Sequence, residues 1–293
     1  MALLACLLLW GGGSARSAPG AGAEQNRAAK DAGPTPAAGK GPARDAGVVA
    51  PDKRQEIQKE AACPAGMTYL PAATFTMGSN DKKNKKYWLE SEGEAEWPGL
   101  DEPIHKVSLN AFCMDTTEVT VTAYRACMRN GKCATPGEER CAWPKPEMDN
   151  HPMDCLTWTQ ADHYCRAMGK LLPSEEQWEY GARGTDRRRY PWGNQDPHYE
   201  DHGYEEFCNV SAGGPSCPVG QYKRVASPFG LLDMAGNLKE WTSSEYCESG
   251  GVCSKIVRGA GGPTLGELRS AHRDYERVSM WSSTLGFRCA LPL

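Results

Sequence analysis

The pattern of hydrophobic and polar positions divides the chain into three parts. Residues 1–10 form an apolar run that is followed by small residues up to Ala23, which is typical of a secretory signal peptide. Residues 24–51 contain mostly Ala, Gly, Pro and a few charges, so they cannot bury enough apolar surface to offset the entropy of ordering. Large apolar and aromatic residues recur from Cys63 onward. We therefore expect a signal peptide at 1–23, a disordered tether at 24–62 and one folded domain at 63–293.

Short strands are expected early in the folded part. Residues 67–70 and 74–78 carry the alternation of a half-buried strand, and 107–115 form a third strand region. After Gly184 we expect mostly loops with isolated strands.

Three helices are predicted between the early strands and Gly184. Residues 120–130 have helical spacing and end before Gly131. A second helix is expected over 157–168, where Thr157 caps the start. A third begins after Ser174, because Gln177 lies three residues further on, as a capping box requires.

Composition excludes several classes of protein. The net charge of -4 shows no basic excess, so nucleic acid is not an expected partner. The apolar run at the start is too short to span a bilayer, and we expect no transmembrane segment. Leu3-Leu4-Ala5-Cys6 resembles a bacterial lipoprotein box, which leaves a lipid anchor at Cys6 open. We expect an exported protein, in a periplasm, a cell envelope or the extracellular space.

The cysteines indicate disulfides. The chain has 13 cysteines, and removing Cys6 with the signal peptide leaves an even number. An even count in an exported chain favours disulfides, and no pair has the spacing of a zinc site. We expect local bridges, such as Cys208 with Cys217 and Cys247 with Cys253.

Several ordered motifs resemble the formylglycine-generating-enzyme, or sulfatase-modifying-factor, family. They include Asp115-Thr116-Thr117-Glu118-Val119-Thr120, Gly236-Asn237-Leu238-Lys239-Glu240-Trp241 and the closing Gly286-Phe287-Arg288-Cys289. Together the motifs lie at 66–78, 101–107, 115–120, 169–184, 190–193, 230–242 and 285–289. The resemblance implies an α+β domain of the C-type-lectin-like kind, with little regular secondary structure.

The chain departs from the catalytic pattern of that family. Active members resemble copper-dependent oxidases that convert the cysteine of a sulfatase Cys-x-Pro-x-Arg sequence to formylglycine. Their chemistry uses two cysteines, because soft thiolates suit Cu(I). The corresponding positions here hold about Thr264 and Arg269. The sequence therefore does not favour copper.

The resemblance also implies bridges and calcium. Cys165 and Cys289 match a family disulfide, whereas a second family bridge is lost at Ala182 and near Ser270. Family calcium ligands match Asp233, the carbonyls of Gly236 and Leu238, and Glu240, with a weaker second site at Asn209 and Val210. The alternative is that the Asp233 and Glu240 carboxylates accept hydrogen bonds from nearby backbone amides.

The family places its peptide site near the Gly-rich strand end, where the candidates are Arg273, Tyr275, Arg277 and Trp281. Arginines beside aromatic rings suit carboxylate or sulfate groups. The alternative is that Arg273 and Arg288 pair with internal carboxylates.

Three functions stay open at this point. The first is a diverged or non-catalytic member that binds a peptide, protein or glycan. The second is an oxidase that still makes formylglycine. The third is a structural module of the envelope. Fold alone does not choose among them.

Overall fold

The computed structural model describes residues 63–80, 103–137, 141–196, 207–208, 215–248, 250–259 and 266–293. The chain divides into two units, Met1–Ala50 and Pro51–Leu293, and every described residue belongs to the second. The predicted signal peptide and tether lie outside the described residues.

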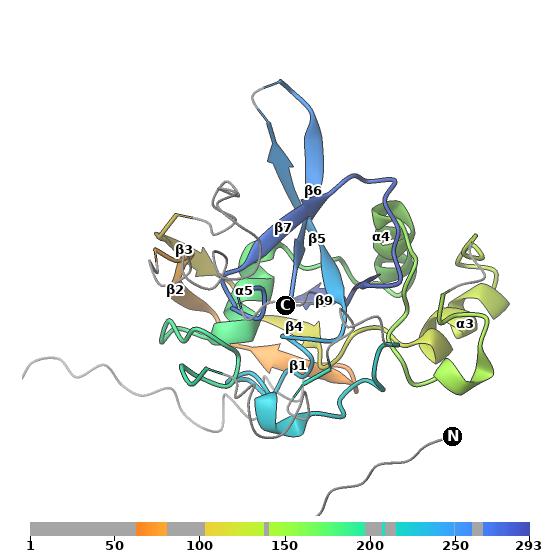
Figure 1. Cartoon of the computed structure of the whole chain (residues 1–293), viewed down its shortest axis with the longest axis horizontal. Coiled ribbons are helices and arrows are strands. Elements are labelled where there is room, and N and C mark those ends of the chain that lie inside the picture. Colours follow the sequence, from red (N-terminus) through yellow and green to blue (C-terminus); the bar gives the residue numbers. More distant parts are fainter. Residues whose placement is uncertain are drawn as a thin grey trace, which may run out of the picture. The chain divides into compact units, whose positions relative to one another are not determined.

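The strands form three small sheets (Figure 1). The first has the order β1 (Met67–Leu70), β4 (Phe112–Asp115) and β9 (Ala290–Pro292). The second pairs β2 (Ala73–Met77) with β3 (His105–Leu109). The third has the order β7 (Arg273–Glu276), β6 (Cys253–Arg258), β5 (Lys239–Cys247) and β8 (Leu285–Gly286). Only the β5–β8 pairing is parallel among the described strands.

Two strand predictions are wrong in detail. The region 107–115 is not one strand, because the chain turns after Leu109 and sends β3 and β4 into different sheets. The strands after Gly184 are not isolated either, since they assemble into the four-stranded sheet. The long β5–β6 hairpin of that sheet projects at the top of Figure 1.

The three predicted helices are confirmed, and their caps explain their start points. They are α3 (Val121–Arg129), α4 (Trp158–Ala167) and α5 (Glu175–Arg183), with short 3-10 turns η1 (Pro146–Met148) and η3 (Lys223–Val225). The caps are Thr120, Thr157 and Ser174, and each side chain accepts a hydrogen bond from the backbone N–H three residues on. Capping boxes form at Thr157 and at Ser174. Each such cap stabilises its helix by about 1 kcal/mol.

The core surrounds two fully buried tryptophans. Trp178 of α5 packs in a cluster with residues of β1, β2 and β4, while Trp241 of β5 packs in a cluster with α3 and α4. The Trp241 indole N–H donates to the carbonyl of Leu156 at 2.9 Å, so its burial leaves no unpaired donor. Helix α5 contacts β2, β5 and β6, which places it between two of the sheets.

Six disulfides tie together segments of little regular structure. They join Cys63 to Cys113, Cys127 to Cys133, Cys141 to Cys155, Cys165 to Cys289, Cys208 to Cys217 and Cys247 to Cys253. The predicted bridge between Cys165 and Cys289 and the two predicted local bridges are confirmed. Six disulfides in one domain indicate that it folds in an oxidising compartment. Across the described residues, every helix is too short or too polar to cross a bilayer.

Candidate functional site

The turn predicted to bind calcium is shaped by two residues with left-handed backbone. Gly236 has φ 86° and Asn237 has φ 54°. A Cβ atom on residue 236 would lie 2.6 Å from the carbonyl oxygen of Cys208, so only glycine fits there. The Asn237 N–H donates to that same carbonyl at 2.7 Å. The close approach fixes the chain direction at which β5 begins.

Glu240 of this turn forms a fully buried ion pair with Arg288. Its Oε1 and Oε2 atoms each accept a hydrogen bond from the guanidinium at 2.7 Å. Oε2 also accepts the indole N–H of Trp178 at 2.9 Å. Arg288 donates in addition to the carbonyls of Leu232, Asp115 and Thr116. The Glu240 carboxylate is therefore held by side-chain donors. The alternative, in which it accepts hydrogen bonds from backbone amides, is wrong for Glu240.

Two further carboxyl groups lie beside this pair, and one of them was missed from the sequence. Glu118 is buried, and it accepts hydrogen bonds from the Asn237 side chain at 3.2 Å and the Leu238 N–H at 3.3 Å. Burial first, and then the charges of Asp233 and Glu240, raise the pKa of Glu118 well above its ordinary value. The signal for it lies in the motif 115–120, but nothing in the sequence shows that Glu118 reaches the turn at 233–240.

Asp233 shows the same effect. Its Oδ2 accepts the Gly220 N–H at 2.6 Å, and the carboxyl group of Glu118 lies near enough for the two charges to interact. Burial raises the pKa of Asp233, although the Gly220 N–H and the Arg288 charge oppose the shift. The cluster thus brings three carboxyl groups to one guanidinium.

This cluster fits the predicted calcium ion only in part. Buried carboxylates whose pKa values are raised suit a cation, because a divalent ion stabilises their ionised forms. Glu240, however, is committed to Arg288 and Trp178, which leaves Asp233 and Glu118 as the better carboxylate ligands. Calcium at this turn stays a prediction. Asn209 and Val210 of the weaker predicted site lie outside the described residues.

The two positions predicted to correspond to the family's catalytic cysteines hold Thr264 and Arg269. Thr264 lies outside the described residues. Arg269 is buried, and its Nε–H donates to the carbonyl of Gly266 at 2.9 Å. All twelve cysteines from Cys63 to Cys289 are consumed in the six disulfides, so this stretch of the chain offers no thiol pair to a soft metal ion.

Two of the four predicted ligand-binding residues lie together on the third sheet. The ring of Tyr275 stacks on that of Tyr246, with centroids 4.9 Å apart, and the Arg273 guanidinium lies 5.8 Å from the Tyr246 ring centre. Arg273 also approaches Glu175, with Nε 3.8 Å from Oε2, as the alternative reading expected. Tyr246 was missed, since only the pairing of β5, β6 and β7 brings it to Tyr275.

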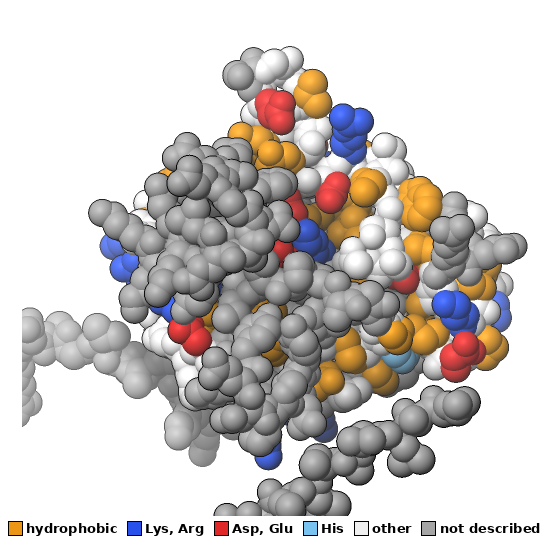
Figure 2. All heavy atoms as spheres, in the orientation of Figure 1, with side chains coloured by type: hydrophobic (Ala, Val, Ile, Leu, Met, Phe, Trp, Pro, Cys, Tyr) orange, Lys and Arg blue, Asp and Glu red, His pale blue; other side chains and the backbone are white. Residues whose placement is uncertain are grey.

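Large hydrophobic side chains are also exposed on β5, at the tip of the β5–β6 hairpin and in the segment that follows β7. They are Tyr246 at 38%, Val252 at 62%, Val278 at 40%, Met280 at 42% and Trp281 at 44% exposure. Figure 2 shows separate hydrophobic side chains on and beside the projecting hairpin, among charged and polar ones. Val252 lies at the hairpin tip beside the start of β6, and the register of β6 with β7 carries Arg277 and Val278 toward that tip. Among the described residues, Trp281 is exposed, and Arg277 is engaged through its carbonyl, which accepts the Met280 N–H at 2.8 Å. We call Arg273, Tyr246, Tyr275 and this apolar fringe the tyrosine surface.

The comparisons with known proteins agree with this fold. The model of the sulfatase-modifying factor enzyme 1-like domain (FGE-sulfatase) matches residues 53–293, and the chain therefore belongs to this family. The match begins at residue 53, whereas the folded domain was predicted from residue 63, and residues 53–62 lie outside the described part.

Individual relatives are similar at about one residue in four. Inactive C-alpha-formylglycine-generating enzyme 2 of Bos taurus is 26% identical over 283 residues, which cover 76% of this chain and 87% of the relative. Formylglycine-generating enzyme of Bos taurus is 25% identical over 295 residues, covering 78% and 75%. The solved structure of PvdO from Pseudomonas aeruginosa superposes with a TM-score of 0.59 at 25% identity, covering 78% of this chain and 94% of that one. Because a relative named inactive and one named an enzyme are equally similar, the residues of the site must decide between them.

Proposed function

We propose that this chain is an exported, diverged member of the family that binds a peptide or protein segment and does not make formylglycine. The loss of formylglycine formation rests on one observation: every cysteine from Cys63 to Cys289 is in a disulfide. A disulfide sulfur is no thiolate, so the soft ligand pair that Cu(I) prefers is missing from this part of the chain.

An activity assay on a sulfatase-type peptide tests whether the chain makes formylglycine. The purified domain is incubated with copper, reductant and a peptide that carries Cys-x-Pro-x-Arg, and the peptide mass is followed. We expect no conversion of the cysteine, whereas an active family enzyme serves as the positive control. Conversion that depends on copper would return the oxidase function.

The binding half rests on the tyrosine surface. Stacked tyrosines beside an arginine are enriched where proteins bind one another, because they supply large contact area with few rotatable bonds. The exposed Val252, Val278 and Met280 extend this surface with apolar area that the described residues leave open. A glycan is the alternative ligand, since sugars also stack on tyrosine rings.

Selection from a displayed peptide library tests the binding half. We expect recovered peptides to lose affinity about tenfold or more when Tyr246→Ala or Tyr275→Ala is introduced. Tyr222→Ala is the matched control, because Tyr222 is only partly buried and packs elsewhere. Peptides that ignore both tyrosines, or binding of glycans alone, would contradict a peptide ligand at this surface.

Export and calcium are part of the same proposal. Cleavage of a signal peptide after Ala23 would leave a mature chain that starts at Glu24, which sequencing of the protein from an extracytoplasmic fraction can verify. Calcium would be held by Asp233 and Glu118 with backbone carbonyls of the turn, where it would neutralise buried negative charge. Detection of an uncleaved chain in the cytoplasm would argue against export.

A further inference from the structure

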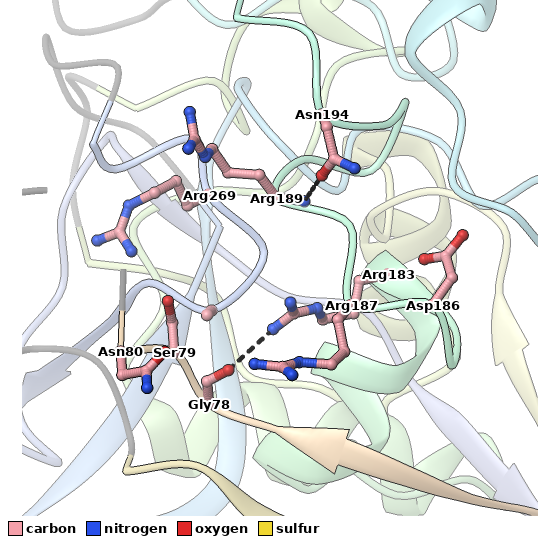
Figure 3. A pocket seen from close by; sticks show the side chains of 10 residues that line it. Gly78, Ser79, Asn80, Arg183, Asp186, Arg187, Arg189, Asn194 and Arg269 are labelled. Atoms are coloured by element: carbon pink, nitrogen blue, oxygen red, sulfur yellow. Dashed lines mark hydrogen bonds between the residues drawn. The ribbon is translucent and has the colours of Figure 1, made fainter. Parts of the chain in front are cut away.

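A basic cavity lies apart from the tyrosine surface. Its volume is about 380 Å³, and it opens between the end of β2, the last turn of α5 with the loop that follows, and the segment at 269–271. Figure 3 shows side chains from these segments converging on it. Its lining residues are Gly78, Ser79, Asn80, Arg183, Asp186, Arg187, Arg189, Asn194, Arg269 and Ala271.

The charges of the lining are strongly one-sided. Four arginines face a single acid, and that acid is engaged elsewhere, since Asp186 accepts hydrogen bonds from Arg188 at 2.7 to 3.1 Å. Figure 3 shows the Asp186 carboxylate turned away from the arginine side chains. Arg187 is exposed and forms no ion pair with a described residue. Arg189 pairs with Asp196 at 2.8 Å and Arg183 with Glu179 at 3.0 Å, and neither acid belongs to the lining.

The wall behind the cavity adds to this imbalance. Arg183 and Arg258 are both buried, and the two guanidinium groups share one carboxylate, that of Glu179. Within the part of the chain that the structure describes, the Nε–H groups of Arg183 and Arg258 have no hydrogen-bond partner. Buried donors of a charged group are costly to leave unpaired, and Arg183, at 5% exposure of its side chain, lines the cavity.

Two further observations agree with a positive potential here. Burial first, and then the charges of Arg269 and Lys239, lower the pKa of His272 to about 3, although Asp274 opposes the shift. Because its pKa is lowered, His272 stays neutral. It directly follows Ala271, which lines the cavity. Arg187 has φ 61°, a conformation that costs a non-glycine residue energy and that places its side chain along the cavity wall.

We propose that this cavity binds a phosphate or sulfate group. Arg183 and Arg187 line the cavity from the end of α5 and the loop that follows, and Arg269 lines it from the segment at 269–271. Guanidinium groups therefore border the cavity from two segments, which suits a tetrahedral oxyanion better than a flat carboxylate. The cavity lies at the lower end of the range of small-molecule sites, about 300 to 1,000 Å³. It has room for more than the bare ion, and the ligand is a phosphorylated or sulfated small molecule or residue.

Calorimetric titration of the purified domain with inorganic phosphate, sulfate and acetate, at constant ionic strength set with chloride, tests the proposal. We expect saturable binding of phosphate or sulfate and at least tenfold weaker binding of acetate. The preferred ion of the first two identifies the source of the group. The variant Arg187→Gln is expected to weaken binding about tenfold, because it removes one charge-assisted hydrogen bond.

Arg129→Gln is the matched control, since Arg129 is an exposed arginine on α3 that does not line the cavity. Unfolding curves of both variants confirm that they fold. The proposal is overturned by the absence of saturable binding of both tetrahedral ions, by acetate binding as tightly, or by equal weakening in the two variants. Tyr246→Ala should leave anion binding unchanged. Failure of the anion-binding proposal can therefore be distinguished from failure of the peptide-binding proposal.

Discussion

Two buried charge clusters lie side by side in this domain, and they differ in sign. Around the turn at 233–240, three carboxyl groups share Arg288, whose guanidinium donates on every nitrogen. Glu179 of α5 is shared by two guanidinium groups, those of Arg183 on α5 and Arg258 on β6, and neither Nε–H has a hydrogen-bond partner among the described residues. Glu240 and Arg258 are direct neighbours across β5 and β6, and Trp178 contacts both, so one tryptophan separates the acidic cluster from the basic one.

The difference teaches how each excess of charge can be relieved. A buried carboxyl group can take up a proton, and the raised pKa values of Glu118 and Asp233 show that tendency. A guanidinium cannot release its proton in a protein. The acidic cluster can therefore be neutralised by protons or by a cation, whereas the basic cluster can be neutralised only by a negatively charged group, such as the anion proposed for the cavity.

Breaking the acidic cluster at its cation should have the largest effect. Arg288→Met leaves Glu240 and its neighbours buried without a positive charge, so we expect a loss of about 3 to 5 kcal/mol in the free energy of unfolding. Urea unfolding measures it, with Arg129→Met as the exposed control. A loss below about 1 kcal/mol would show that the cluster does not depend on this ion pair.

Removing the negative charge of Glu179 from the basic cluster should lower the free energy of unfolding by less than Arg288→Met does. Glu179→Gln keeps a side-chain oxygen that accepts a hydrogen bond, so we expect a loss of about 2 to 3 kcal/mol by the same measurement. Phosphate should stabilise this variant more than the native chain, because the unbalanced positive charge is larger. Equal stabilisation by phosphate in the native chain and in Glu179→Gln would show that anion binding in the cavity does not depend on the charge of Glu179.

The protonation of Glu118 gives a smaller effect that depends on pH. Its folded pKa is raised, so the folded state favours the protonated form, and stability is lost as pH rises from about 4.5 through the folded pKa. Glu118→Gln mimics the protonated form and should gain about 1 kcal/mol at pH 8 in the presence of a chelator. The free energy of unfolding at pH 5 and pH 8 measures this gain.

Glu147→Gln is the exposed control for that measurement. With excess calcium the native chain should recover the lost stability, while Glu118→Gln should respond less. Identical pH profiles for native chain and variant would contradict the buried acidic cluster.

The smallest effect is expected at Arg187. Arg187→Gly relieves the left-handed backbone at φ 61°, and after the entropy cost of glycine in the unfolded chain we expect a gain of about 0.5 kcal/mol. Phosphate binding should weaken about tenfold in the same variant, as in Arg187→Gln. A clear destabilisation would show that Arg187 supports the fold and not only the cavity.

Local features of the fold could be predicted from the sequence, because neighbouring residues determine them. Thr157 and Ser174 cap helices, Gly236 and Asn237 turn the chain, and Cys208 and Cys247 pair with nearby partners. The site depends instead on contacts between distant segments. Glu118 lies more than 100 positions from the Asn237 side chain that it contacts, and only the sheet pairing brings Tyr246 to Tyr275. The basic cavity was missed for the same reason, since Arg187 and Arg269 come from separate loops.

If every cysteine from Cys63 to Cys289 is in a disulfide, the mature domain has no thiol pair for copper. The most direct test is the intact mass of the mature domain after treatment with a thiol-alkylating reagent, before and after reduction. We expect no uptake of reagent before reduction and twelve additions after it, one for each cysteine from Cys63 to Cys289. Two additions before reduction, together with stoichiometric binding of copper, would contradict the account.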